Sequence, residues 1–476
     1  MIVMSDDSII KILSELVSFK TFSPDILNSQ QFTSEYKVPD SFFKCRKFIE
    51  RILLEANFKT ENYEFGGFPM LVAWHRPEKH KNATRILLLM HFDVVPAEKT
   101  WKNAFKMTTR DDSELGKVAE GRGVTDMKGG VSALLASVKK ISEFTNGDIC
   151  IGFTSDEELG GARGTANLLS EIFRKKKNWM PQYVITADAA GEEIINLRRN
   201  AHFIRATFPR TKKKITGIKK VLTFNSKIIS AKTSHAAYYR KEIDQHAVYE
   251  ASKYLDKNNE YILSITGKEF LKTNIIPKEV VLELVVPNNN NIKDPKNSLE
   301  YEIEDSLTEI MKMLHILPSI PLPQGKTSLG TNITVNIINL FEERIEMLID
   351  LRSMLKSTDK ELLEDSFRSL FSSIRFEPKV EIQSFAGPII TPEDSLLVRS
   401  AKKAWKSVTG KDITTAERGG ATDARFFSHL GIECIDIGPI GFNVHSTNET
   451  VVLESLKRLS NFFPELVKTL SSKEMN

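Results

Sequence analysis

The sequence has few cysteines and no long apolar run. Its 476 residues include three cysteines, Cys45, Cys150 and Cys434, and none of them stands in a CxxC spacing. An odd number of cysteines without that spacing argues against a disulfide framework and favours a reducing compartment. No stretch is long enough to cross a bilayer, and the first residues lack the basic segment and apolar core of a signal peptide. We therefore expect a cytoplasmic protein without a membrane partner.

An excess of charge of one sign is also lacking. The chain carries 66 Lys and Arg residues against 62 Asp and Glu residues, for a formal net charge of +4. This balance gives no reason to expect a nucleic acid or an anionic membrane as a partner. The short basic runs 175–177 and 212–214 are interpreted as solvated faces or loops. Hydrophobic residues make up 41% and charged residues 27%, as in soluble globular proteins, and the length favours two domains.

Short apolar runs with strand character are each followed by imidazole or carboxylate side chains. The runs are 85–90, followed by His91 and Asp93; 150–154, followed by Asp156, Glu157 and Glu158; and 182–187, followed by Asp188. In open α/β sheets, sites form beyond the carboxyl ends of the strands. Asp126 lies between the first two runs in a Gly-rich turn, just before a helical pattern over 131–141. Such a convergence predicts a site for Zn²⁺.

The middle of the chain has a different pattern. From about Arg198 the charge density rises, and short strand-like runs alternate with helical and polar stretches. This alternation predicts a small antiparallel sheet with helices on one face. The expected strands are 203–208, 227–231, 332–340, 344–352 and 380–385, and the expected helices are 244–255 and 359–373. Near residue 387 the α/β pattern returns, with an apolar strand at 432–437 and His445 in the loop beyond it.

These motifs resemble the signature blocks of the M20 metallopeptidase family. His91-Phe-Asp93, Gly121-Arg-Gly-Val-Thr-Asp126-Met-Lys-Gly-Gly and Glu157-Glu158 carry the resemblance, and the family's remaining landmarks follow in order. The family includes aminoacylase, acetylornithine deacetylase, succinyl-diaminopimelate desuccinylase, glutamate carboxypeptidase and several dipeptidases. The resemblance implies an α/β fold, with a discontinuous di-zinc exopeptidase-type catalytic domain at 1–197 and 386–476. An inserted α+β lid domain is expected at 198–385, with an extra, partly irregular elaboration at 271–330.

The resemblance also implies a site for two Zn²⁺ ions, for which Co²⁺ or Mn²⁺ can substitute. Asp126 would be the carboxylate shared by both ions. One zinc would take His91 and Asp188 as further ligands, and the other would take Glu158 and His445. A shared carboxylate holds two metals about 3.5–4 Å apart, which is the separation usual in two-metal hydrolases.

Further residues receive catalytic or binding roles from the same resemblance. Catalytic roles fall to Glu157 as the general base, Asp93 as the partner of the His91 ring, and His235 as a lid histidine that reaches the scissile carbonyl. Substrate-binding roles fall to Arg352 and Asn336 in the lid and to Gly420 and Thr422 in the block Gly-Gly-Ala-Thr-Asp-Ala-Arg. The lid departs from the family pattern, because the glycine-rich hairpin between Asn336 and Arg352 is missing.

The expected function is hydrolysis of an amide or peptide bond in a small N-acyl amino acid or short peptide with a free carboxylate. An M28-type di-zinc aminopeptidase is an alternative with similar ligands, but it normally lacks a large insert and the sequence Asp-Met-Lys-Gly-Gly. A catalytically silent binding relative is a second alternative, although all five ligand positions and Glu157 are intact. The lid would allow a homodimer. The sequence does not decide between a deacylase and a peptidase. Aspartate at position 188, where many deacylases of the family have glutamate, slightly favours a dipeptidase.

Overall fold

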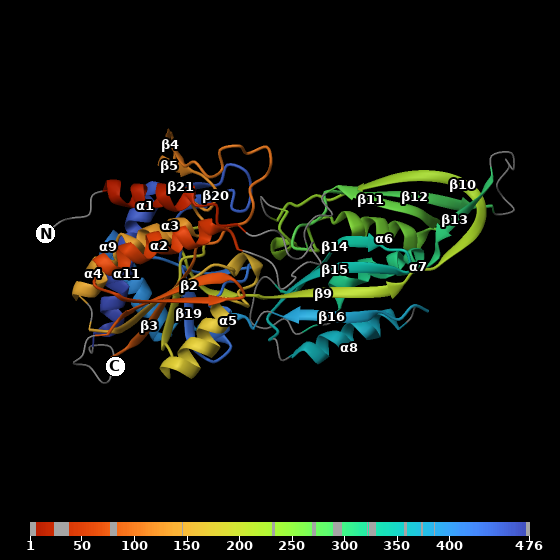
Figure 1. The fold of residues 1–476 in the computed structure, drawn as a ribbon. Helices are drawn as coiled ribbons and strands as arrows, with labels where there is room; N and C mark the ends of the chain where they lie inside the picture. The colour runs from red at the N-terminus through yellow and green to blue at the C-terminus, as the bar shows by residue number, and fades with distance from the viewer. Residues whose placement is uncertain are drawn as a thin grey trace. The chain divides into compact units, whose positions relative to one another are not determined.

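A computed structural model describes residues 6–22, 38–76, 83–144, 146–230, 234–268, 273–288, 298–320, 322, 330–356, 359–372, 375–384 and 386–472. The chain forms two compact units, each with its own core (Figure 1). Unit 1 comprises Met1–Arg198 and Pro388–Asn476, and unit 2 comprises Arg199–Gly387. The predicted boundaries at 197 and 385 are close to this division, although Phe385 itself lies outside the described residues. The roles of catalytic domain and lid stay predictions.

A nine-stranded sheet forms the centre of unit 1, in the order β1-β2-β6-β3-β7-β19-β8-β17, with β18 beside β8. The strands are β1 (Lys59–Phe65), β2 (Phe68–His75), β3 (Arg85–His91), β6 (Asp148–Thr154), β7 (Tyr183–Thr186), β8 (Ile194–Arg198), β17 (Ile389–Ile390), β18 (Thr415–Arg418) and β19 (Glu433–Asp436). Strands β6, β3, β7 and β19 run parallel. Because helices cover both faces, these strands are almost continuously apolar.

Two hydrophobic clusters pack against opposite faces of this sheet. On one face lie α1 (Asp6–Ser18), α2 (Asp40–Glu55), α3 (Lys128–Leu135), α4 (Val138–Phe144), α9 (Leu396–Thr409) and α11 (Leu453–Ser471), with α5 (Thr165–Asn167) on the other face (Figure 1). A π-helical segment, Leu168–Lys177, continues α5, and α10 (Arg425–Ser428) packs in the same cluster. Apolar residues at helical spacing in α1 and α11 build the first cluster.

A small antiparallel sheet joins two distant parts of unit 1. Its strands are β4 (Thr108–Asp112), β5 (Gly116–Glu120), β20 (Gly441–Phe442) and β21 (Thr450–Val452), in the order β20-β21-β5-β4. Thr450 pairs with Glu120, and Val452 pairs with Val118. This register brings the loop that follows β5 next to the loop that precedes β21. The two loops carry Asp126 and His445.

Unit 2 contains two four-stranded antiparallel sheets, where the sequence predicted one. The sheet β14-β15-β9-β16 consists of β9 (Asn200–Pro209), β14 (Asn332–Leu340), β15 (Arg344–Ser353) and β16 (Lys379–Ser384). The sheet β11-β12-β10-β13 consists of β10 (Lys212–Asn225), β11 (Tyr261–Lys268), β12 (Glu279–Pro287) and β13 (Leu299–Glu304). Both sheets share one core with α6 (Ala247–Lys257), α7 (Asp305–Met313) and α8 (Lys360–Phe371).

The second sheet accounts for the differences from the expected elements. The basic run 212–214 is an exposed part of β10, where Lys214 pairs with Glu300 at 2.8 Å across to β13. The described residues of the segment 271–330 include the strands β12 and β13 and the helix α7. At the expected strand 227–231, Lys227 makes only an isolated bridge to Gln245, and residue 231 lies outside the described residues. Within the described residues, no helix is long and apolar enough to span a membrane.

Candidate metal centre

Three neighbouring parallel strands deliver the first side chains of the site. Strands β6, β3 and β7 are adjacent, and His91 pairs in register with Thr154 at their carboxyl ends. His91 is the last residue of β3, Asp188 follows β7, and the short helical turn Glu157–Leu159 follows β6. The carboxyl ends of parallel strands meet at one edge of a sheet, so these groups converge without any long loop.

Asp126 reaches the same edge from the turn before α3. A Cβ atom on Gly129 would lie 2.2 Å from the Val124 carbonyl oxygen, and one on Gly130 would lie 2.5 Å from Ala187 Cβ. Only glycine fits at such distances, so the Gly-Gly pair lets the first turn of α3 approach the segment that leads to Asp188. Close packing therefore explains why glycine occupies both positions of this motif.

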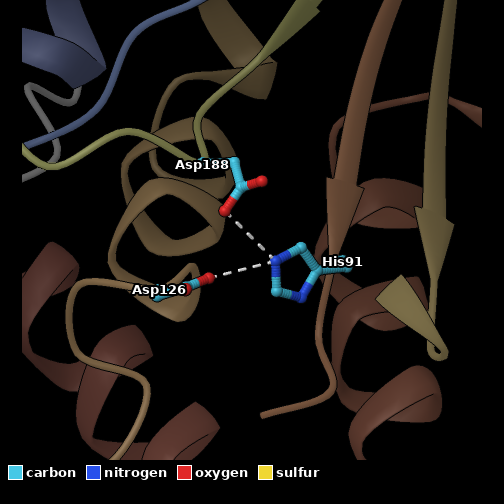
Figure 2. A group of neighbouring side chains, drawn as sticks. All are labelled: His91, Asp126 and Asp188. Atoms are coloured by element: carbon cyan, nitrogen blue, oxygen red, sulfur yellow. Dashed lines mark ion pairs between the residues drawn. The ribbon is translucent and has the colours of Figure 1, made fainter. Parts of the chain in front are cut away.

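Two clusters of side chains share Asp126. His91 Nε2 is 3.2 Å from Asp126 Oδ1 and 3.5 Å from Asp188 Oδ1, and Figure 2 shows the ring directed at both carboxylates. His445 Nε2 is 2.9 Å from Asp126 Oδ2 and 3.2 Å from Glu158 Oε1. In each cluster the three ligand atoms lie within 4.8 Å of one another. The structure thus brings together all five residues that the sequence assigned to metal ions.

The atoms of this cluster fit divalent cations. Among the residues that the structure describes, His91 Nε2 and Asp126 Oδ1 are buried polar atoms without a hydrogen-bond partner. Burying an unpaired polar atom is costly, and a cation between the two atoms would remove that cost. Imidazole and carboxylate are ligands of Zn²⁺ and related ions. Because each oxygen of Asp126 faces a different histidine, the five residues fit two ions with one shared carboxylate.

The carboxylates of the two clusters also change the pKa values of the two histidines. Burial alone would lower the pKa of His91, but the facing carboxylates of Asp126, Asp188 and Asp93 raise that pKa well above its usual range. Burial also opposes the charge of His445, yet the carboxylates of Glu158 and Asp126 raise its pKa in the same way. Two imidazoles surrounded by carboxylates therefore hold positive charge strongly. The carboxylates thus favour positive charge at this place, whether a proton or a metal ion carries it.

Asp93 contacts the His91 ring through its backbone oxygen as well as through its carboxylate. His91 Nδ1 is 3.1 Å from the backbone oxygen of Asp93 and 3.5 Å from its carboxylate. The carboxylate itself accepts hydrogen bonds from the backbone N–H groups of Glu157 at 3.3 Å and Glu158 at 3.0 Å. The Asp93 backbone is thus the nearer partner of the His91 ring, while its side chain holds the turn that carries both glutamates.

Glu157 lies in the same short turn as Glu158 but belongs to neither of the two clusters. Burial, and then the charge of Asp188, raise the pKa of Glu157 well above its usual range. Arg425 Nη1 lies 3.5 Å from Glu157 Oε1 and limits this rise. A carboxyl group with a raised pKa near a metal site is suited to take up and release a proton.

The model of the family described as Peptidase family M20/M25/M40 matches residues 87–469. The chain belongs to this family. The predicted membership of the M20 group is thereby confirmed, and with it an enzyme that hydrolyses carbon–nitrogen bonds. The family is metal-dependent, in agreement with the two clusters around Asp126.

Relatives with full-length similarity are desuccinylases by name. A succinyl-diaminopimelate desuccinylase from Nautilia profundicola is 23% identical over 463 residues, which cover 97% of this chain and 99% of that protein. A protein of the same name from Helicobacter pylori is 26% identical over 409 residues, covering 84% and 85% of the two chains. The similarity therefore extends over both units of the M20 chain.

Solved structures confirm the fold. The aminoacylhistidine dipeptidase from Vibrio alginolyticus matches with a TM-score of 0.64 at 14% identity, covering 97% of this chain and 96% of that one. An M20 family metallo-carboxypeptidase from Sulfolobus solfataricus matches with a TM-score of 0.60 at 15% identity, covering 98% and 99%. The predicted mixed α/β fold of the M20 type is therefore confirmed.

Sequence reasoning missed several buried groups that hold this M20 site in place. Asp436, at the end of β19, accepts a 2.7 Å hydrogen bond from the Asp188 backbone N–H and forms an ion pair with Arg198. Arg425 donates to the Gly160 carbonyl oxygen at 2.9 Å, just after the turn of the two glutamates. A buried charged residue at a strand end is the signal that could have identified Asp436, because charged residues are rarely buried without a partner.

The block that was expected to bind substrate makes several contacts within unit 1. Thr422 is buried, and the Gly420 carbonyl oxygen accepts a 2.9 Å hydrogen bond from Arg198. Next to them, Asp423 accepts a 2.5 Å hydrogen bond from the Thr165 hydroxyl. The structure thus places this block behind the turn of the two glutamates. Substrate contacts of Gly420 and Thr422 stay predictions.

The three candidates in unit 2 have partners within that unit. His235 Nδ1 accepts a 3.0 Å hydrogen bond from the Ala237 backbone N–H. Asn336 is fully buried and donates to the Thr273 carbonyl oxygen at 2.5 Å. Arg352 is also buried and forms two parallel hydrogen bonds of 2.7 and 2.8 Å to the Asp350 carboxylate. Their roles toward a substrate stay predictions.

Proposed function

We propose that this chain is a two-zinc amide hydrolase in which Asp126 is shared by both ions and Glu157 carries the proton. The observation that supports this most directly is the pair of clusters on opposite oxygens of Asp126. Among the described residues, two of the ligand atoms, His91 Nε2 and Asp126 Oδ1, are buried without a hydrogen-bond partner. Two divalent cations bound there would polarise the substrate carbonyl and make a water molecule acidic enough to attack it. We assign zinc because the ligands are imidazole and carboxylate.

The residues of the chain then have separate tasks. Glu157 takes a proton from the attacking water and passes it to the nitrogen of the leaving amine, which its raised pKa favours. Asp93 keeps the backbone of this turn fixed, so that Glu157 and Glu158 keep their positions beside the metal ligands. His235 is proposed to stabilise the negative charge that develops on the carbonyl oxygen, as the resemblance implies.

For the substrate we propose an N-acyl amino acid with a free carboxylate, of which an N-succinyl amino acid is the first candidate. The full-length relatives that are named desuccinylases support this choice. A dipeptide is the second candidate, because the third ligand is Asp188 and a dipeptidase is among the similar structures. In both cases the bond that breaks is an amide, and the products are a carboxylic acid and a free amine.

The experiment combines a metal count with a substrate screen. Purified protein, loaded with zinc and dialysed, should contain two ions per chain by elemental analysis. Release of primary amine is then followed for N-succinyl amino acids, N-acetyl amino acids and dipeptides, with Glu157→Gln as the inactive control. At most one weakly held ion would contradict the two-metal proposal. Two ions with no amine release from any of these classes would contradict the proposed reaction.

A further inference from the structure

A buried carboxylate, Glu449, connects two ligand-bearing loops of the candidate metal centre. It lies four residues after His445, directly before β21, and its side chain is fully buried. The Glu449 backbone oxygen accepts a 3.0 Å hydrogen bond from the Gly121 N–H, at the start of the loop that leads to Asp126. The backbone of Glu449 thus contacts the loop that carries Asp126, and its side chain contacts the same loop.

The carboxylate accepts four hydrogen bonds from that loop. Oε2 accepts from Arg122 Nη1 at 2.7 Å and from the Gly123 N–H at 2.9 Å. Oε1 accepts from the Thr125 N–H at 2.9 Å and from the Asp126 N–H at 3.1 Å. Both oxygens thus have two donors each, so Glu449 is not itself available as a metal ligand.

The loop depends on this acceptor for physical reasons. Three of its backbone N–H groups point at one buried anion, and without it they would lose their partner away from water. The Arg122 side chain is buried as well, so its charge would be left uncompensated. Gly123 has φ +83°, and a Cβ atom there would lie 2.6 Å from Val94 Cγ1, so the loop has little room to rearrange.

Two other buried carboxylates, Asp436 and Asp93, contact backbone N–H groups of ligand-bearing segments, but neither contacts the loop of Asp126 in the hydrogen bonds of the described residues. Asp436 holds the backbone of Asp188, and Asp93 holds the turn of Glu157 and Glu158. Glu449 differs because it stands on the loop of His445 and binds the loop of Asp126, the ligand that both clusters share.

We propose that Glu449 is a positioning residue for the whole metal centre, fixing Asp126 and His445 relative to each other so that both ions bind tightly. The inference rests on the proposed two-metal function. It predicts that a change at Glu449 weakens both ions, whereas a change at a carboxylate that holds one ligand weakens mainly one. Loss of a group that orients metal ligands typically lowers metal affinity about 10–100-fold.

The test compares Glu449→Gln with Asp436→Asn in the full chain. Both substitutions replace one carboxylate oxygen by an amide nitrogen and nearly keep the shape of the side chain. Zinc affinity is measured by competition with a chelator, and the ions retained after dialysis are counted. We expect Glu449→Gln to weaken both ions by about 10–100-fold, and Asp436→Asn to weaken chiefly the ion of His91 and Asp188.

A general loss of stability is controlled by Asp244→Asn in unit 2. Asp244 is buried and accepts backbone hydrogen bonds from Ile229, Ser230 and Arg240, so it resembles Glu449 in kind. This variant should lower the melting temperature and still bind two ions with wild-type affinity. With excess metal, Glu449→Gln should regain most of its kcat, which a purely structural defect would not allow.

The outcomes separate this inference from the proposed function. A wild-type chain that holds fewer than two ions overturns the two-metal function and the inference with it. If the wild type holds two ions and folded Glu449→Gln holds both with unchanged affinity, the inference alone is overturned. It is also overturned if only the ion of Glu158 and His445 is weakened, because Glu449 then acts on one loop. Glu449→Ala serves as a stronger second variant where it folds.

Discussion

Buried histidines of the two units have opposite electrostatic surroundings. In unit 1, the carboxylates that face His91 and His445 raise their pKa values well above the usual range despite burial. In unit 2, burial lowers the pKa of His246 to about 4, and burial together with the charge of Arg352 lowers the pKa of His202 to about 4. His91, His202 and His246 are all buried and His445 is half-buried, so the neighbouring charges decide whether an imidazole is held in a charged or a neutral form.

Hydrogen bonding separates the two units less sharply, because His246 Nδ1 in unit 2 is also buried without a hydrogen-bond partner among the described residues. In unit 1, among the described residues, ligand atoms of His91 and Asp126 are buried without a hydrogen-bond partner. In unit 2, the side chain of Asn336 is bonded to Thr273 and faces His246 Nε2 at 3.1 Å. Unmatched donors and acceptors that converge in a buried place mark a functional site, whereas matched ones stabilise the fold. The following predictions, beginning with the largest effect, test this contrast.

Removing the shared ligand should have the largest effect. Asp126→Ala deletes the carboxylate that faces both histidines, so both ions should be lost and amide hydrolysis should fall below detection. Glu158→Ala removes a ligand of one cluster only and should leave one ion bound. Elemental analysis after dialysis distinguishes the two variants. Retention of both ions by Asp126→Ala would show that the ligands lie elsewhere.

Glu157→Gln should abolish most turnover while the metal ions stay bound. The amide has nearly the same shape as the carboxylate but cannot accept and return a proton, and loss of a general base typically lowers kcat about 10²–10⁴-fold. Glu171→Gln, at an exposed residue that pairs with Lys175, is the matched control and should keep full activity. If Glu157→Gln stays within a few-fold of the wild type, another group acts as the base.

Arg352→Lys tests whether unit 2 contributes a substrate contact. Asp350 takes the Nε and Nη2 side of the guanidinium, so a substrate carboxylate would have to bind through Nη1. We expect about a tenfold lower kcat/KM for a free-acid substrate and little change for its methyl amide, because a single ammonium group cannot pair with Asp350 and also keep a separate donor at the place of Nη1. The broken bonds to Asp350 should also cost about 1–3 kcal/mol of stability. Equal losses on both substrates would assign Arg352 to packing alone.

The smallest effect is the pH dependence of unit 2. His246 has a pKa of about 4 in the folded chain, below the value of about 6.5 in an unfolded one. Below pH 6.5 the unfolded chain binds a proton that the folded chain does not, so stability falls toward pH 4, by up to about 1.4 kcal/mol per pH unit. The stability gap between wild type and His246→Gln in urea should therefore narrow by about 1–2 kcal/mol from pH 7.5 to 5. A gap that is independent of pH would contradict this.

Several parts of the fold could be predicted from the sequence because their signal is local. The apolar runs that became β3, β6 and β7 are buried on both faces, and the polar residues that follow them stand where the strands end. The second sheet of unit 2 was missed for the opposite reason. Lys214 on β10 and Glu300 on β13 pair across more than eighty residues of sequence, and a charged exposed face looks like a loop until its partner strand is known.

The sequence by itself determined which residue types follow each apolar run, and the family resemblance added the five predicted ligands and the predicted general base. Alternation and strand length act over a few residues, so such positions follow from local pattern. Only the tertiary structure decided which oxygen of Asp126 faces which histidine, and that Glu449 binds the loop of Asp126. It also decided that Arg352 is paired with Asp350. These contacts depend on strand register and on where each buried donor finds its acceptor, which the order of residues along the chain does not specify.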